Sequence, residues 1–189
     1  ISRQAFDLID ASVSAGPTAI VLASMSYSSF CLGRIRNALE FAERIPSVVK
    51  GDPNVGIETT GFSALDWSFF MRARLRAHLG CLDDARVLLR DAIRRARSRE
   101  PSDILVWSLA VTALISDCAG DSAASPLAQE ARRCALEAVD LAERIGSHFS
   151  RVYAYQWLGL AHVRHSDWRA AAEALEGALV LARQHRTGL

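Results

Sequence analysis

The chain has 189 residues, of which 50% are hydrophobic, enough for one ordinary globular domain or for about four helical hairpins with a continuous core. Its formal net charge of +1 lacks the strongly basic balance typical of nucleic-acid-binding proteins, so we expect no nucleic-acid partner. The longest apolar run, Ile104 to Ile115, has 12 residues, fewer than the roughly 20 that span a bilayer, and no signal peptide opens the chain. We therefore expect a cytoplasmic protein without a membrane partner.

Apolar residues recur at helical spacing along the chain, and no segment alternates for long enough to predict a strand. Helices are expected to end at Gly33, Gly80 and Gly120, because glycine readily adopts the left-handed conformation that terminates a helix. Amphipathic second helices follow the first two turns, over Ile35–Val48 and Leu82–Arg97. The sequence therefore predicts an all-helical chain built of hairpins.

The last second helix is expected to begin at Asp167, a natural N-cap, with Ala170 and Ala171 in its first turn. The longest loop signal runs from Lys50 to Gly61, and a shorter one runs from Asp121 to Pro126. Successive turn residues lie 47, 40 and 46 positions apart. We therefore expect hairpins joined by connectors of unequal length.

A bulky ring precedes three of the turns by the same distance. The spacing is 13 residues in each case, from Trp67 to Gly80, from Trp107 to Gly120 and from Tyr153 to Ser166. Two of the second helices share a further pattern of a small residue, an apolar residue and a small residue, namely Ala85, Leu89 and Ala92, and Ala171, Leu175 and Ala178. Self-similarity of this kind identifies a repeat protein.

The last hairpin carries the most specific motif, because Tyr155, Leu158, Gly159 and His162 precede the small-apolar-small pattern. This order resembles the tetratricopeptide repeat, although His162 stands where that repeat has tyrosine. In the second full hairpin Arg72-Ala73 replaces the Leu-Gly pair. The resemblance implies a right-handed superhelix of about four antiparallel helical hairpins, which form a single helical-repeat domain over residues 1–189.

The chain also resembles the C-terminal helical-repeat regions of bacterial signalling ATPases. This resemblance rests on the longer repeat period and on three stretches, Gly51-Asp52-Pro53, Gly61-Phe62-Ser63 and the closing Arg186-Thr187-Gly188-Leu189. These include cyclase-linked ATPases and transcriptional regulators of the maltose-activator type. The resemblance implies that the chain is a fragment of a larger multidomain protein. In such proteins this region mediates sensing or protein contacts, and catalysis belongs to other domains.

The sequence carries no catalytic motif. The single lysine lies in Lys50-Gly51-Asp52, which does not fit a phosphate-binding loop, and neither a dinucleotide fingerprint nor a nucleophile elbow occurs. We therefore expect no enzyme activity and no cofactor. A metal chelated by His162, His165 and Asp167 is one interpretation, but we favour His162 in an aromatic packing slot and His165 at a solvated helix end.

Two further features have both a structural and a functional interpretation. Cys31 and Cys118 each lie two residues before a turn glycine, so we expect them to be small buried hydrophobes rather than reactive thiols. Nine arginines lie between Arg72 and Arg99 against three aspartates. The stripe of Arg86, Arg90 and Arg94 is either a phosphate-binding or acid-binding surface or a solvated outer face, and we favour the solvated face.

The first helices supply the candidate binding residues. In a tetratricopeptide-like superhelix they line the concave surface, and the positions that point into the groove are predicted to be Tyr27 and Phe30; Trp67, Phe70 and Arg74; Trp107, Leu114 and Asp117; and Tyr153, Gln156 and Leu160. Aromatic side chains with a few polar groups are typical of interface anchors. The alternative is that these rings pack between repeats as core.

These observations favour a non-catalytic regulatory module that binds a protein or peptide, or its own copy, through the concave face, with charge supplied by Arg74 and Arg76. A second hypothesis is a small-molecule sensor, because aromatics with polar groups also suit a ligand site. A third is a structural spacer or self-association arm.

Overall fold

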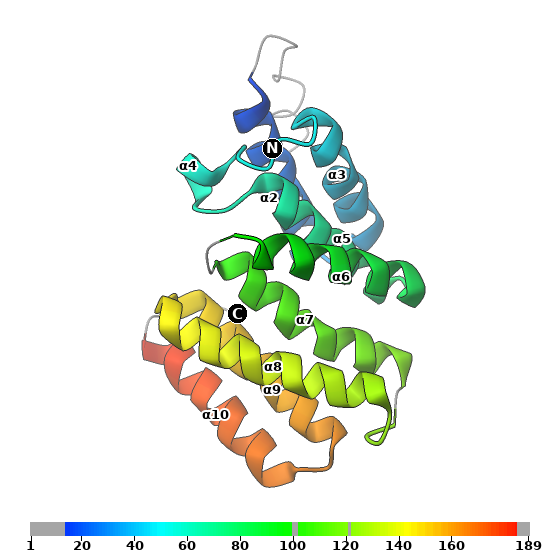
Figure 1. The fold of residues 1–189 in the computed structure, drawn as a ribbon, viewed down its shortest axis with the longest axis vertical. Coiled ribbons are helices and arrows are strands. Elements are labelled where there is room, and N and C mark those ends of the chain that lie inside the picture. The colour runs from blue at the N-terminus through cyan, green and yellow to red at the C-terminus, as the bar shows by residue number, and fades with distance from the viewer. Residues whose placement is uncertain (1–13, 100–101, 121, 185–189) are drawn as a thin grey trace. The chain divides into compact units, whose positions relative to one another are not determined.

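The computed structural model describes residues 14–99, 102–120 and 122–184 (Figure 1). These residues form nine α-helices and no strand, which confirms the all-helical prediction for this part of the chain. The helices are α2 (Ala15–Cys31), α3 (Ile35–Val48), α4 (Ile57–Thr60), α5 (Ala64–His78), α6 (Leu82–Arg97), α7 (Asp103–Ala119), α8 (Pro126–Ile145), α9 (His148–Arg164) and α10 (Trp168–Gln184). The closing stretch from Arg186 to Leu189 lies outside the described residues.

The chain divides into two compact units, residues 1–88 and residues 89–189, with the boundary inside α6. In the first unit α2 packs against α3, and both of these helices contact α5. In the second unit α7 packs against α8, both of these helices contact α9, and α10 packs against α9. Each unit therefore repeats one order of contacts, in which a hairpin packs on the first helix of the next. This order is typical of stacked helical repeats.

The turns between paired helices are the ones that the sequence predicts. Gly33, Gly80 and Gly120 have φ angles of 71°, 79° and 66°, in the left-handed region. The fourth turn adopts the same conformation without a glycine, because Ser166 has a φ of 56°. The predicted bounds of α3 and α6 are also confirmed.

Side-chain caps fix where several helices begin. The carboxylate of Asp167 accepts a hydrogen bond from the backbone N–H of Ala170 at 3.3 Å, as predicted for an N-cap. Ser63 caps α5 and Ser125 caps α8 in the same way, at 3.2 and 3.0 Å. The predicted loop between α3 and α5 contains one more helical turn, α4, which the sequence did not indicate.

Each second helix carries four small or apolar side chains at steps of four, three and four residues, which we call the inner stripe. The sequence showed it in α6 and α10, and the structure adds α3 and α8. The full set is Ala38, Ala42, Ile45 and Val49; Ala85, Leu89, Ala92 and Ala96; Ala131, Ala135, Ala138 and Ala142; and Ala171, Leu175, Ala178 and Ala182. In α3 and α8 these side chains are at most 5% exposed, and α5 and α9 pack on these two helices.

The Leu-Gly pair of the last hairpin has a packing reason. A Cβ atom added to Gly159 in α9 would lie 2.5 Å from Cγ of Leu175 in α10, closer than nonbonded carbons approach. Gly177, in α10, has room instead, because a Cβ there would lie 3.8 Å from the nearest atom, Cδ1 of Tyr155. At Gly159 a methyl group therefore does not fit unless the side chain of Leu175 shifts.

These two glycines give a matched test of this packing. Alanine favours a helix over glycine by about 1 kcal/mol, so Gly177→Ala is expected to raise the free energy of unfolding by about 0.5–1 kcal/mol. Gly159→Ala is expected to lower it by about 1 kcal/mol, because overpacking outweighs the gain in helix propensity. Urea denaturation followed by circular dichroism measures both changes. Stabilisation by both substitutions would contradict the close approach.

Candidate functional site

In the first unit the predicted groove residues divide into two groups. Trp67 and Phe70 on α5 are only 6% and 4% exposed, so the structure places both rings in the core. Tyr27 on α2 is 44% exposed, and Phe30 and Arg74 are half-buried. Only these last three residues are accessible to a partner.

The accessible residues come together between α2 and α5. The guanidinium carbon of Arg74 lies 4.2 Å from the centre of the Phe30 ring, within range of a cation–π interaction. The rings of Phe30 and His78 lie 5.5 Å apart between centres, tilted by 41°. We call Tyr27, Phe30, Arg74 and His78 the α2/α5 face. The sequence prediction missed His78, although it follows Arg74 by four residues and so shares its side of the helix.

The surroundings of the α2/α5 face set its charge. Burial lowers the pKa of His78 below its ordinary value, and the nearby charge of Arg74 lowers it further. Burial also raises the pKa of Tyr27, as does Cys31, whereas Arg74 acts in the opposite direction. At neutral pH the histidine is therefore uncharged and the phenol keeps its proton. The face offers apolar rings, a phenol O–H and a single positive charge.

In the second unit the predicted aromatics belong to a chain of rings along α7 and α9. Trp107 meets Phe149 edge-on at 5.6 Å, Phe149 stacks on Tyr153 at 6.1 Å, and Tyr153 meets Trp157 edge-on at 6.0 Å. Tyr153 is 5% exposed and lies in the core, whereas Phe149 is 36% exposed and Trp107 is half-buried. Phe149 had not been predicted.

Hydrogen bonds hold Trp107 in place. Its indole N–H donates to Oγ of Ser150 at 2.8 Å, and Ser150 in turn donates to the carboxylate of Asp103 at 2.5 Å. Because Asp103 and Trp107 lie on α7 and Ser150 lies on α9, this network joins the first helices of two consecutive hairpins. It orients Trp107 within the second unit.

The remaining predicted residues of this unit have different surroundings. Asp117 forms an ion pair with Arg164, which also donates to the Asp117 backbone carbonyl at 2.5 Å, so this carboxylate ties α7 to α9. Gln156 is exposed, Leu160 is half-buried, and Leu114 is 7% exposed. No described contact joins Gln156 to Asp117 or to Trp107.

A polar cluster surrounds the turn between α9 and α10. Nδ1 of His162 lies 3.6 Å from Oδ2 of Asp167, which is too far for a hydrogen bond, and Arg132 reaches the same oxygen at 3.5 Å. Nε2 of His165 lies 3.2 Å from the carbonyl oxygen of Ala128. Among the described residues no group of three or more His, Cys, Asp or Glu side chains could hold a metal ion. His162 is 7% exposed, so it fills the packing slot that the sequence predicts.

The burial of His162 has a consequence for stability. Burial lowers its pKa, and so do Arg132 and His165, while Asp167 opposes them. The unfolded chain therefore binds this proton more readily than the folded chain, and the stability due to neutral His162 is lost as the pH falls below about 6.5.

We expect the urea midpoint of the wild-type chain to fall between pH 7.5 and 5.5 by more than that of His162→Gln. The variant His78→Gln should remove a further part of the pH dependence, because the pKa of His78 is lowered in the same direction. An identical pH dependence for wild type and His162→Gln would show that His162 is protonated as easily in the folded chain as in the unfolded chain.

The prediction that Cys31 and Cys118 are buried was wrong. Cys31 and Cys118 are both exposed, and of the four cysteines only Cys134 is buried. Cys31 and Cys118 both lie in the last turn of their helices. Partial burial and the charge of Asp117 raise the pKa of Cys118, which disfavours its thiolate.

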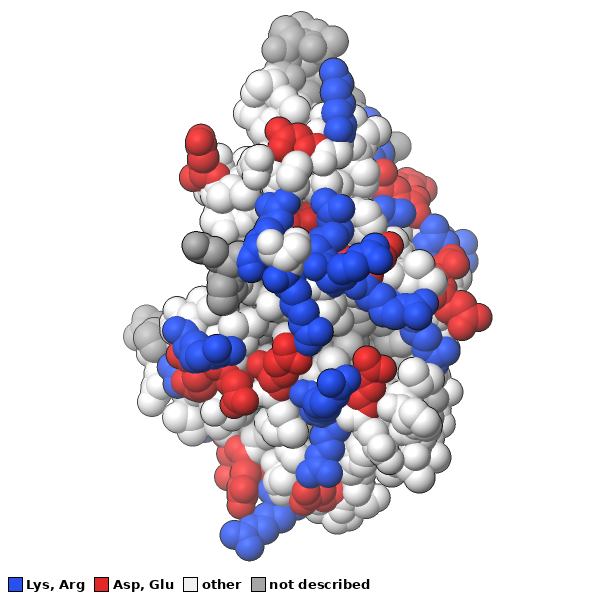
Figure 2. Space-filling view, in the orientation of Figure 1, with Lys and Arg blue, Asp and Glu red and all other residues white. Residues whose placement is uncertain are grey.

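The arginine stripe of α6 is largely neutralised within the helix itself. Arg86 pairs with Asp83 at 3.5 Å, and Arg94 pairs with Asp91 at 2.6 Å. Arg90 is exposed and has no ion-pair partner among the described residues. Figure 2 shows mainly basic side chains over this helix, with carboxylates toward its edges. This arrangement is that of a solvated outer face.

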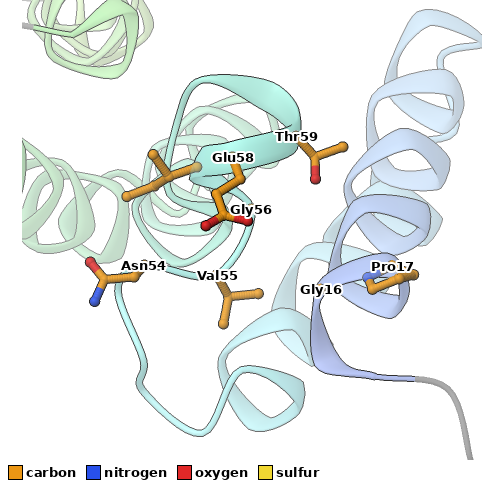
Figure 3. Close-up of a pocket in the computed structure, with 8 residues that line it drawn as sticks. Gly16, Pro17, Asn54, Val55, Gly56, Glu58 and Thr59 are labelled. Carbon is orange, nitrogen blue, oxygen red and sulfur yellow. The ribbon is translucent and has the colours of Figure 1, made fainter.

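A pocket of about 510 Å³ lies in the first unit between the start of α2 and the α4 segment (Figure 3). Asn54, Glu58 and Thr59 are its polar side chains, and Pro17 and Val55 are apolar ones. Its size is that of a small-molecule site. None of the predicted groove residues lines it.

No protein-family model matches the sequence, and no curated protein matches it significantly. In the described part of the chain, no helix has the length and hydropathy needed to cross a membrane. The α2/α5 face therefore stands as a candidate on its own geometry.

Proposed function

We propose that this chain is a non-catalytic helical-repeat module of the tetratricopeptide type, which binds a protein or peptide segment as the regulatory region of a larger bacterial signalling or transcriptional protein. The observation that supports the proposal most directly is the convergence of Tyr27, Phe30 and Arg74 on the α2/α5 face. All three residues were predicted from equivalent positions on the first helices of the hairpins. The tetratricopeptide resemblance and the order of helix contacts also support it.

The chemistry of the α2/α5 face favours an extended segment that carries an apolar and an acidic side chain. Aromatic anchors bury much area with few rotatable bonds, and a guanidinium favours a carboxylate over a neutral or basic group. Because Arg74 is the only charged side chain of this face at neutral pH, a basic segment would be repelled. Specificity would therefore come from charge, and affinity from the rings.

Selection of a random peptide library on the purified 189-residue chain tests this proposal. Enriched peptides are expected to carry an acidic residue near an aromatic or aliphatic one. Arg74→Glu and Tyr27→Ala should each weaken the best peptide by about tenfold, which corresponds to about 1.4 kcal/mol. Val87→Ser, which removes a side chain that is 50% exposed on α6, serves as the control. Peptides that bind equally to all four proteins would contradict the assignment.

The pocket beside α4 favours a second candidate function, a small-molecule sensor. Its polar side chains, Asn54, Glu58 and Thr59, suit a hydroxylated or cationic ligand. A ligand at about 100 times its dissociation constant stabilises the folded state by about 2.7 kcal/mol, which a thermal-shift screen of metabolites detects. Glu58→Gln and Asn54→Ala should reduce that shift. A screen without any stabilising compound would count against this candidate.

A further inference from the structure

The inner stripe of α10 differs from those of the other second helices in how completely it is covered. All four inner-stripe residues are at most 5% exposed in each of α3, α6 and α8. In α8, for example, Ala135 is 0% exposed. The residue of α10 equivalent to Ala135 is Leu175, which is 38% exposed. The same four-three-four spacing therefore continues into α10, but there it is incompletely covered.

The exposed side of α10 is strongly apolar. Trp168 is 66% exposed and Leu179 is 53% exposed. Trp168 and Leu175 are seven residues apart, and Leu175 and Leu179 are four apart, so the three side chains lie along one side of the helix. We call Trp168, Leu175 and Leu179 the α10 face. Neighbouring apolar side chains this exposed are typical of a surface that a partner covers.

The α8–α9 contact shows what covers such a surface. There α9 brings Arg151 within 3.0 Å of Glu143 on α8, and the side chain of Tyr155 interacts with the same carboxylate. Glu143 directly follows the last inner-stripe residue of α8. The equivalent residue of α10 is Arg183, which follows Ala182 and has no ion-pair partner in the part of the chain that the structure describes. A helix docked on α10 as α9 docks on α8 would therefore meet the opposite charge.

We propose that the α10 face binds an amphipathic helix of a partner protein, which carries an apolar stripe and a carboxylate opposite Arg183. The apolar stripe would cover Trp168, Leu175 and Leu179, and the carboxylate would take the place that Arg151 has on α9. This surface lies in the second unit and the α2/α5 face in the first, and the proposal does not depend on the function proposed for that face.

Peptides that correspond to α9 provide the probe. One has the natural sequence of residues 148–164, and the other carries Arg151→Glu, so that its carboxylate can pair with Arg183. Fluorescence anisotropy with labelled peptides is expected to show that the Arg151→Glu peptide binds the 189-residue chain about three- to fivefold more tightly, as for an exposed ion pair. Arg183→Glu in the chain should reverse this preference.

Apolar contact is tested separately from charge. Leu179→Asp should weaken both peptides by at least tenfold while circular dichroism shows unchanged helix content, because this side chain is half exposed. Leu127→Ser, at a position that is 41% exposed on α8, is the matched control. Equal binding of the two peptides, binding insensitive to Leu179→Asp, or no binding of either peptide would overturn the proposal. A dimer in light scattering that Leu179→Asp dissociates, and that excludes both peptides, would assign the face to a second copy of the chain instead.

Discussion

Close packing across small side chains is the contact on which the rest of this structure depends. The inner stripe of α3 and α8 is built mostly of alanine, and α5 and α9 pack against these helices. Small residues allow helix axes to approach, which increases the number of van der Waals contacts per turn. Gly159 extends the same principle to the α9–α10 pair, where even a methyl group does not fit without a shift of Leu175.

This packing determines which side chains are left for binding. Because α5 is covered by α2 and α3, Trp67 and Phe70 belong to the core, while Arg74 and His78 reach the surface beside Phe30. In the second unit the contact between α7 and α9 is partly polar, since Ser150 joins Trp107 to Asp103 and Arg164 holds Asp117. Polar groups at such a junction restrict the register of the two helices, because a shifted pairing would leave them unsatisfied.

The α2/α5 face and the α10 face differ in composition because they lie on different helices of the repeated hairpin. The α2/α5 face lies where consecutive first helices meet, and it combines rings with one cation. The α10 face lies on a second helix and continues a stripe that is covered in the earlier hairpins. A repeat unit buries its apolar side by stacking, so a second helix on which nothing packs leaves that side exposed. The two faces therefore call for different partners, an acidic segment and an amphipathic helix.

The sequence by itself determined the hairpin helices and the turns between them, though not α4, because helical periodicity and left-handed glycines act within a few residues. It also placed Tyr27, Phe30 and Arg74 in one register. Only the tertiary structure decided that Trp67, Phe70 and Tyr153 are buried, that Cys31 and Cys118 are exposed, and that His78 joins the α2/α5 face. The reason is that a first helix with apolar residues on nearly every side has no single buried face in its own pattern, and its neighbours select one.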